Sequence, residues 1–225
     1  MSNWGTIALG CRIGERADPL FVRSWQNMIA SGLRKGDGMI DPAVEMPHHF
    51  AANYLAKLFL KSDANTLCMV DSDMIFSADT LSKLRDNPEG AGYGTLSPLC
   101  TTRRNPYVPV VLTTKGKSAW TARVDLVDGS LVQVDATCVA FALIRRQVFL
   151  DIDEKFKVGG WFFDWGPQGY GEDTTFSDRA RACGYKIGID TGIQIGHRGS
   201  MTFGWDVEKK QTVFSDYNQV KLFTT

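Results

Sequence analysis

Two aspartates after a short apolar run carry the most informative chemistry in this chain. Leu67-Cys68-Met69-Val70 is typical of a buried strand, and Asp71 and Asp73 stand at its exit with Ser72 between them. Side chains two residues apart on a strand point to the same side, so the carboxylates repel each other unless a cation lies beside them. A divalent cation that carries phosphate oxygens accounts for the pair. The competing interpretation is an ordinary turn, in which Asp and Ser are common.

A second acidic pair stands at the start of an expected helix. Glu172 and Asp173 follow the segment 161–171, which is rich in glycine and aromatic residues and is expected to be a site loop rather than part of the core. Helix-dipole complementarity explains one acid well without any site. Flat aromatic side chains beside carboxylates suit the binding of a sugar or a base. The aromatic residues of this loop are Trp161, Phe162, Phe163, Trp165 and Tyr170.

His197 is the third candidate. A lone histidine after a strand is more often structural than a ligand, but this one lies between Gly196 and Gly199, in a loop that the backbone can bring close to a ligand. Neutral imidazole is a good ligand for manganese alongside carboxylates.

A sheet that gathers strand ends has to position these residues. Strands alternate with helices in the first half of the chain, which predicts a largely parallel sheet with ligands at the carboxyl ends of its strands. The expected strands are 6–10, 67–71, 90–98, 131–134, 137–144 and 186–190, with an edge strand at 108–112. The expected helices are 20–32, 50–61, 77–85 with Ser77 as its cap, 146–150, 172–183 ended by Gly184, and a possible one near 217–223. The segment 36–47 is expected to be irregular.

Composition indicates an ordinary globular protein. The 225 residues fit one α/β domain, with 44% apolar and 22% charged residues. The formal net charge is zero, so no global field favours nucleic acid or a membrane. We expect no membrane span, no signal peptide and a cytoplasmic location. The scattered cysteines, expected to be reduced, are Cys11, Cys68, Cys100, Cys138 and Cys183.

Four segments in order resemble glycosyltransferases with the A-type (GT-A) fold, in particular family-2-like members and short phage and bacterial stand-alone transferases. The segment 67–74 resembles their DxD segment, 141–149 resembles the segment before the acceptor loop, 171–180 resembles the ED helix, and 183–197 resembles the strand that leads to the C-terminal metal-binding histidine. The match extends from about residue 52 to 204.

The resemblance implies a single-domain α/β, Rossmann-like fold with a mostly parallel central sheet flanked by helices and a small antiparallel portion. It divides residues 1–225 into a nucleotide-sugar-binding half (1–100), an acceptor and catalytic half (101–205) and a C-terminal tail (206–225).

The resemblance also implies roles for individual residues. Asp73 would bind the metal directly, and Asp71 would contact the ribose or bind the metal through water. His197 would complete the metal site. Asp173 would be the general base that deprotonates the acceptor hydroxyl, with Glu172 orienting acceptor or donor. The implied cofactors are Mn²⁺ or Mg²⁺ and a nucleotide-sugar, of which a UDP-sugar is expected.

The first-strand loop, residues 10–16, would hold the nucleotide. Arg12 and Arg16 are candidates for phosphate or base contacts, although a surface arginine is the default interpretation. The remaining donor-binding candidates are Gly10, Ser72 and Asn53. The chain departs from the family pattern at Ala52, at Gly10-Cys11-Arg12, at Cys138 and at Ala140, which affects donor identity more than reaction class.

The acceptor stays open between a glycan or small molecule and a hydroxylated base in phage DNA. Trp161, Trp165, Tyr170 and Gly171 are the loop candidates for acceptor binding. Only the basic stretch 101–123 favours DNA, and a solvated loop is the default interpretation of such a stretch. Its candidate contacts, Arg103 and Arg104, are shared with the other acceptors. A nucleotidyltransferase and a non-catalytic sugar-binding module are the alternative functions. A base at Asp173 argues for inversion, but a retaining outcome stays open, as does the oligomeric state.

Overall fold

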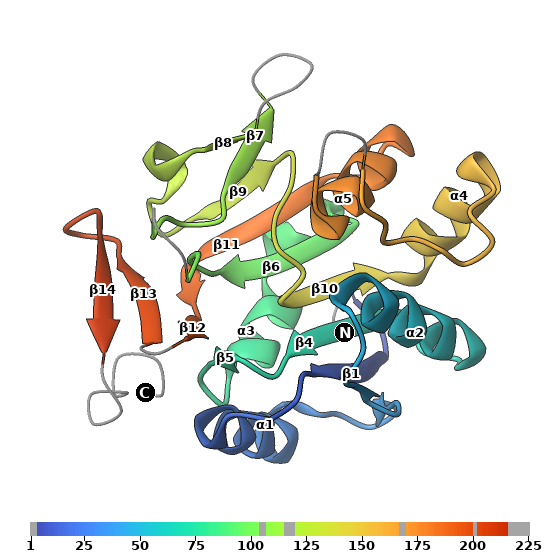
Figure 1. Ribbon diagram of the computed structural model, residues 1–225, viewed down its shortest axis with the longest axis horizontal. Helices are drawn as coiled ribbons and strands as arrows, with labels where there is room; N and C mark the ends of the chain where they lie inside the picture. The colour runs from blue at the N-terminus through green and yellow to red at the C-terminus, as the bar shows by residue number, and fades with distance from the viewer. Residues whose placement is uncertain (1–3, 104–106, 115–119, 167–169, 200–201, 216–225) are drawn as a thin grey trace.

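The computed structural model describes residues 4–103, 107–114, 120–166, 170–199 and 202–215 (Figure 1). Within these residues the chain forms one large sheet flanked by helices, together with small antiparallel sheets, as predicted. The strands of the large sheet are β1 (Ile7–Ile13), β2 (Gly38–Met39), β3 (Ala43–Val44), β4 (Thr66–Asp71), β6 (Thr95–Leu99), β9 (Leu131–Val134), β10 (Phe141–Arg145) and β11 (Ile187–Gln194).

The strands of the large sheet lie in the order β2-β1-β4-β10-β6-β11-β9, and β3 also pairs with β1. β1 runs parallel to β2, β3 and β4, and β6 runs parallel to β11. β10 is antiparallel to both of its neighbours, and β9 is antiparallel to β11. The parallel register of β1 and β4 sets Arg12 opposite Asp71, so these two strands deliver a cation and an anion to the same edge.

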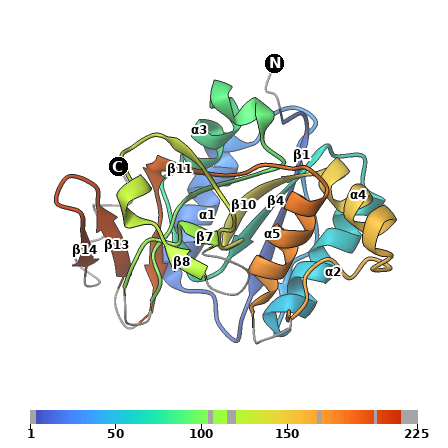
Figure 2. The ribbon, with the colours of Figure 1, turned by 90° about the horizontal axis from the view of Figure 1, so that it is seen from above.

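Helices cover both faces of the sheet. The α-helices of the described residues are α1 (Pro19–Gly32), α2 (His48–Lys61), α3 (Thr80–Asp86), α4 (Arg146–Phe156) and α5 (Glu172–Ala182). Figure 2 shows α2, α4 and α5 gathered on one side of the ribbon. α1 packs with α3. No helix among the described residues is long and apolar enough to cross a bilayer.

The two faces of β4 explain its unbroken apolar sequence. Leu67 and Met69 belong to the core cluster that includes α2, α4 and α5, whereas Cys68 and Val70 belong to the cluster that includes α1 and α3. A strand with helices on both sides buries successive residues on opposite faces, so it reads as a continuous hydrophobic run. The first carboxylate of this segment therefore comes at the end of the strand, at Asp71.

A second, antiparallel sheet includes the segment that follows β4. Its strands, in the order β14-β13-β12-β5, are β5 (Met74–Ile75), β12 (Gly196–Arg198), β13 (Thr202–Asp206) and β14 (Gln211–Ser215). β12 pairs with β5 through His197 and Met74, and this pairing brings His197 next to the segment after β4. A hairpin of β7 (Leu112–Thr114) and β8 (Trp120–Ala122) forms a third, separate ladder.

Several predicted boundaries differ from the structure. β1 continues to Ile13 instead of ending at residue 10, because its far end pairs with β3 and β4. The helix predicted from Ser77 begins at Thr80, with Asp79 in the cap position. The strand predicted from residue 90 begins at Thr95, because Pro88–Gly92 form a 3₁₀ turn.

Further differences concern the second half of the chain. The strand predicted over 137–144 begins at Phe141, and the strand predicted to end at residue 190 continues to Gln194. The short helix predicted at 146–150 extends to Phe156, because Ile152 is also buried in the core. Gly184 ends α5 with φ +91°, as predicted. The possible helix at 217–223 lies outside the described residues.

Candidate functional site

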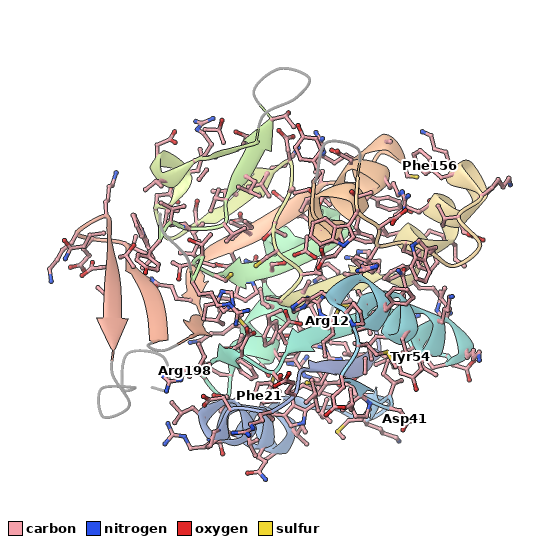
Figure 3. All side chains as sticks on the ribbon, viewed as in Figure 1. Arg12, Phe21, Asp41, Tyr54, Phe156 and Arg198 are labelled. Atoms are coloured by element: carbon pink, nitrogen blue, oxygen red, sulfur yellow. The ribbon has the colours of Figure 1, made fainter. Side chains whose placement is uncertain are left out.

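A buried ion pair joins the ends of β1 and β4. The Arg12 guanidinium donates from Nη2 to Asp71 Oδ2 over 2.9 Å and from Nε to Asp71 Oδ1. Arg12 is only 5% exposed and lies near the middle of the molecule in Figure 3. The default interpretation of Arg12 as a surface arginine is wrong, because the parallel register of the two strands buries it against a carboxylate.

Arg12 interacts electrostatically with more than one acidic residue. Burial alone would lower the pKa of the Arg12 guanidinium, but Asp71, and after it Asp173 and Glu172, raise this pKa instead. The two acidic pairs predicted from the sequence therefore lie around one buried arginine. The positive charge that offsets Asp71 in this structure comes from the protein itself.

We expect Arg12→Met to cost about 3–5 kcal/mol of folding free energy, because it leaves the Asp71 carboxylate buried without its partner. Urea denaturation followed by circular dichroism measures this loss. The double variant Arg12→Met/Asp71→Leu removes both charges and should recover most of the lost stability. Equal stability of Arg12→Met and the unmodified protein would contradict the assignment of this pair.

The second predicted aspartate faces the predicted histidine. Asp73 Oδ2 lies 3.3 Å from His197 Nε2, and the backbone N–H of Arg198 donates to the Asp73 carbonyl over 2.7 Å. On the other side of the ring, His197 Nδ1 lies 2.9 Å from the carbonyl oxygen of Thr101. Arg103 Nη1 donates to the same Asp73 oxygen over 2.6 Å.

This donor set fits a divalent cation. A carbonyl oxygen only accepts hydrogen bonds, so the contact with Thr101 places a proton on Nδ1 of His197. Burial acts to raise the pKa of the Asp73 carboxyl, but the hydrogen bond with His197 and the nearby positive charges lower this pKa overall. In the neutral ring, Nε2 would carry the lone pair that binds a metal ion such as Mn²⁺. Within the described ranges no group of three or more His, Cys, Asp or Glu gathers at one point. Asp73 and His197 would hold the ion, and phosphate oxygens and water would supply its other ligands.

Asp173 lies at the first turn of α5. Its Oδ2 accepts from the Val139 N–H over 3.2 Å, while its Oδ1 is buried and has no hydrogen-bond partner within the described residues. Burial raises the pKa of the Asp173 carboxyl to about 7; Arg12 opposes the shift, and Glu172 and Asp71 add to it. A carboxyl group with a pKa near neutrality and a free oxygen is suited to take up a proton.

A cavity of about 220 Å³ opens beside these groups. Arg12, Asp71 and Ser72 line it, and Asp73 and Arg103 complete the side toward His197. The predicted Arg16 lines it as well. Three further lining residues, which precede α2 or lie in its first turn, were not predicted from the sequence: Met46, His48 and Ala51.

Two predicted donor contacts have structural roles instead. Gly10 lies inside β1, where a Cβ would come within 3.1 Å of Ile40 and 3.2 Å of Leu55, so this glycine allows close packing. The Asn53 amide is fully engaged: it donates to the carbonyls of His49 and Phe163 and accepts from two backbone N–H groups of the aromatic loop. No donor or acceptor of Asn53 is left for a nucleotide.

The aromatic loop divides into a core half and a surface half. Phe162 and Phe163 are buried, so the prediction that this loop avoids the core is wrong for them. Phe162 packs against Phe149 of α4 and Phe163 against Phe176 of α5, whereas Trp165 is 58% exposed. Tyr170 and Gly171 lead into α5, and the Gly171 carbonyl accepts from the N–H of Thr175.

Two residues of α2 extend the exposed aromatic surface. His49 and Phe50 contact Trp161, with ring centroids 6.2 and 4.9 Å apart, and the Trp165 indole N–H donates to His49 Nδ1 over 3.3 Å. We call these four residues the aromatic platform. His48 and Ala51, which flank His49 and Phe50 in the sequence, line the 220 Å³ cavity, whereas the platform residues are not among those that line it. His49 and Phe50 are adjacent ring-bearing residues at the start of α2, and this pair is the sequence signal for the platform.

The basic stretch 101–123 does not form a free cationic surface where the structure describes it. Arg103 is paired with Asp73, and Arg123 with Asp125. The predicted contact Arg104 lies outside the described residues, as do Lys115 and Lys117.

A larger cavity, of about 450 Å³, lies elsewhere, beside α3 and the β13–β14 hairpin. Lys83, Trp205 and Asp206 are among the residues that line it, and none of the predicted site residues does. Because Asp71, Asp73 and the buried Arg12 line the smaller cavity, and His197 faces Asp73, we assign the candidate site there.

Comparisons with known proteins support this architecture at the level of the fold. No family model and no curated protein sequence matches the chain. Among solved structures, A197 from STIV is similar with a TM-score of 0.60 and 13% identity over 94% of each chain. GalNAc-T7, in a structure with UDP, GalNAc and Mn²⁺, is similar with a TM-score of 0.58 and 13% identity over 87% of this chain and 44% of that one. The chain has the mixed α/β architecture of these GT-A fold neighbours.

Proposed function

We propose that this protein is a metal-dependent glycosyltransferase that moves a sugar from a nucleoside-diphosphate sugar, expected to be a UDP-sugar, to an acceptor hydroxyl. One observation carries the proposal: Asp73 and His197 face each other at 3.3 Å beside a cavity at the carboxyl ends of parallel strands. The GT-A fold supports it, and so does the GalNAc-T7 neighbour, whose structure holds UDP, GalNAc and Mn²⁺.

The charges around the cavity suit a nucleoside diphosphate. Arg16 and Arg103 line it, and the Ser72 hydroxyl, which accepts from the Gly14 N–H over 3.4 Å, stands beside Asp71. Arg103 is a candidate for binding the phosphates. Its side chain is 40% exposed, and a cation bound at Asp73 would replace Arg103 as the partner of that carboxylate, which would leave the guanidinium available to the phosphates. A divalent ion at Asp73 and His197 would offset the charge that develops on the leaving diphosphate.

Asp173 is the proposed general base. Its buried Oδ1 has no hydrogen-bond partner in the part of the chain that the structure describes, and the carboxyl pKa of about 7 lets Asp173 accept a proton from the acceptor hydroxyl near neutral pH. Arg12 lies close enough to Asp173 to raise its own pKa, so the guanidinium also stabilises the ionised base. A base in this position favours direct displacement with inversion at the anomeric carbon.

A screen of nucleotide-sugars with MnCl₂ tests the reaction class. We expect slow hydrolysis of one donor to a nucleoside diphosphate and a free sugar, detected by anion-exchange chromatography, and loss of this activity with EDTA. Release of pyrophosphate or of a sugar phosphate would identify a nucleotidyltransferase instead. Donor binding without turnover, in the presence of a panel of saccharides, would indicate a sugar-binding module.

The aromatic platform favours a carbohydrate acceptor. Phe50 and Trp165 are 48% and 58% exposed, and Phe50 lies in the first turn of α2, the turn from which His48 and Ala51 line the donor cavity. Aromatic faces that carry a polar handle, such as the indole N–H of Trp165, combine apolar contact area with hydrogen bonding. A sugar ring presents the matching combination of C–H and hydroxyl groups.

We expect Trp165→Ala and Phe50→Ala to raise the KM for a saccharide acceptor about 10-fold each, which is the equivalent of about 1.4 kcal/mol of lost contact. Because neither side chain lines the cavity, hydrolysis of the donor without acceptor should not change. Steady-state kinetics in the presence and absence of acceptor separate the two effects.

Phe156→Ala is the matched control. Phe156 is 41% exposed at the end of α4, far from Arg12 in Figure 3. An equal increase of KM in this control, or a loss of donor hydrolysis in Trp165→Ala, would contradict the platform.

A further inference from the structure

Two cysteines that are far apart in the sequence meet beside the site. Cys100 follows β6 directly, Cys138 precedes β10, and their Sγ atoms lie 2.9 Å apart. β6 and β10 are antiparallel neighbours, so the chain segments beyond their paired residues converge. The separation in a disulfide is about 2.05 Å, so roughly 1 Å of approach would form the bond.

A cavity gives small molecules access to this pair. It has a volume of about 320 Å³, and Cys100 and Cys138 line it together with Arg103, Val110 and His197. Cys138 is partly exposed, whereas Cys100 is buried. The hydrogen bond with Cys138, together with burial, raises the pKa of the Cys100 thiol, so Cys138 is the side chain that an oxidant reaches first.

The residues next to the cysteines hold the site. Thr101, which follows Cys100, accepts from His197 Nδ1 through its carbonyl oxygen at 2.9 Å. Val139, which follows Cys138, donates its N–H to Asp173 Oδ2 over 3.2 Å. A movement of the two cysteines toward each other therefore shifts one backbone group that orients the histidine and another that orients the acid.

We propose that Cys100 and Cys138 are a reversible oxidation site, which forms an intramolecular disulfide with a small-molecule disulfide as the oxidant. The Cys138 thiolate attacks the small disulfide, forms a mixed disulfide and expels one thiolate. Cys100 then loses its proton and attacks Cys138 Sγ, expelling the second thiolate. The protons of the two cysteines end on the two released thiols, so one small disulfide is reduced for each protein disulfide formed.

The bond itself is tested without any glycosyl donor. The folded, full-length protein is treated with oxidised glutathione, and free thiols are alkylated before tryptic mass spectrometry. We expect a loss of two alkylation sites, a peptide pair joined through Cys100 and Cys138, and full reversal by dithiothreitol. Cys138→Ser should form no such pair, whereas Cys183→Ser, a control on a partly exposed thiol elsewhere, should form it unchanged. Persistence of both free thiols in a protein whose circular dichroism is native would overturn the site.

The effect on the site rests on the proposed function and has its own readout. A displacement of about 1 Å in positioning groups can cost about 10²-fold in rate, so we expect the oxidised protein to transfer sugar about 10²-fold more slowly and to recover on reduction. Cys138→Ser should keep the same rate before and after oxidant. A disulfide that forms without changing the rate would overturn this consequence alone. A disulfide in a protein that transfers no sugar in either state would contradict the proposed function and leave the oxidation site standing.

Discussion

Asp173→Asn is expected to lower the rate of sugar transfer by about 10²- to 10⁴-fold, the range that a positioned general base contributes. The amide has the shape of the carboxyl group and can still accept from the Val139 N–H, but it cannot take up a proton. Donor binding should be little affected, because Asp173 does not line the donor cavity. Initial rates at saturating donor, with the donor Kd from calorimetry, separate the two effects. Asp178→Asn, on the exposed side of the same helix, is the control.

The pH dependence supports the same assignment with a definite sign. Because the Asp173 pKa is raised to about 7, kcat/KM in the unmodified protein should increase tenfold per pH unit below pH 7 and level off above it. The residual activity of Asp173→Asn should lack this limb. An unchanged pH profile in Asp173→Asn would assign the titration to another group.

Folding stability should move in the opposite sense to activity. Unfolded aspartate has a pKa of about 3.9, so the native state binds the extra proton between pH 4 and pH 7 and loses stability as the pH rises through that window. Asp173→Asn stays neutral, so it should match the unmodified protein at pH 4 and exceed it in thermal stability at pH 8. Lower thermal stability of Asp173→Asn than of the unmodified protein at pH 8 would show that ionised Asp173 is well paired in the native state.

Asp73→Asn is expected to lower transfer at fixed Mn²⁺ by about 10³-fold, because a divalent ion at a leaving diphosphate supplies several kcal/mol of charge stabilisation. His197→Ala removes the opposing ligand and should cause a similar loss. Mn²⁺ titration followed by electron paramagnetic resonance measures the ion directly, without turnover. Both variants should bind Mn²⁺ more weakly, and EDTA should abolish transfer by the unmodified protein.

Asp86→Asn is the matched control for the metal site, since Asp86 pairs with Arg34 on the surface. This variant should keep both Mn²⁺ binding and transfer. Transfer that survives EDTA and Asp73→Asn alike would overturn the metal site while leaving the role of Asp173 open.

The sequence predicted that β4 is a strand buried on both faces, because an unbroken apolar run like the one before Asp71 is typical of such a strand, and the structure confirms the strand. The sequence did not predict which charge would meet Asp71. That partner is set by the register between β1 and β4, in which Arg12 falls opposite Asp71, and neither strand specifies this register alone. The prediction that Asp71 contacts the ribose, or binds the metal through water, therefore competes with an arginine that only the pairing of the two strands reveals.

The aromatic loop shows a second limit of sequence reasoning. Phe162, Phe163 and Trp165 are all aromatic, and the sequence of the loop has no periodicity that separates buried from exposed positions. Their burial follows from packing against Phe149 and Phe176, which come from helices α4 and α5. Contacts of this kind join residues that are distant in the sequence, as does the meeting of Cys100 and Cys138, so no local pattern announces them.

The hydrogen bonds of Asn53 restrict which amino acids its position can accept. Its two amide protons reach the carbonyls of His49 and Phe163, and its oxygen receives the N–H groups of Phe162 and Phe163 at 2.7 and 3.0 Å. Aspartate has the length but lacks the donors, and glutamine has the groups but one methylene too many. The twenty amino acids contain no second side chain with this length and this pattern of donors and acceptors, so helix α2 and the aromatic loop are joined by a residue without a substitute.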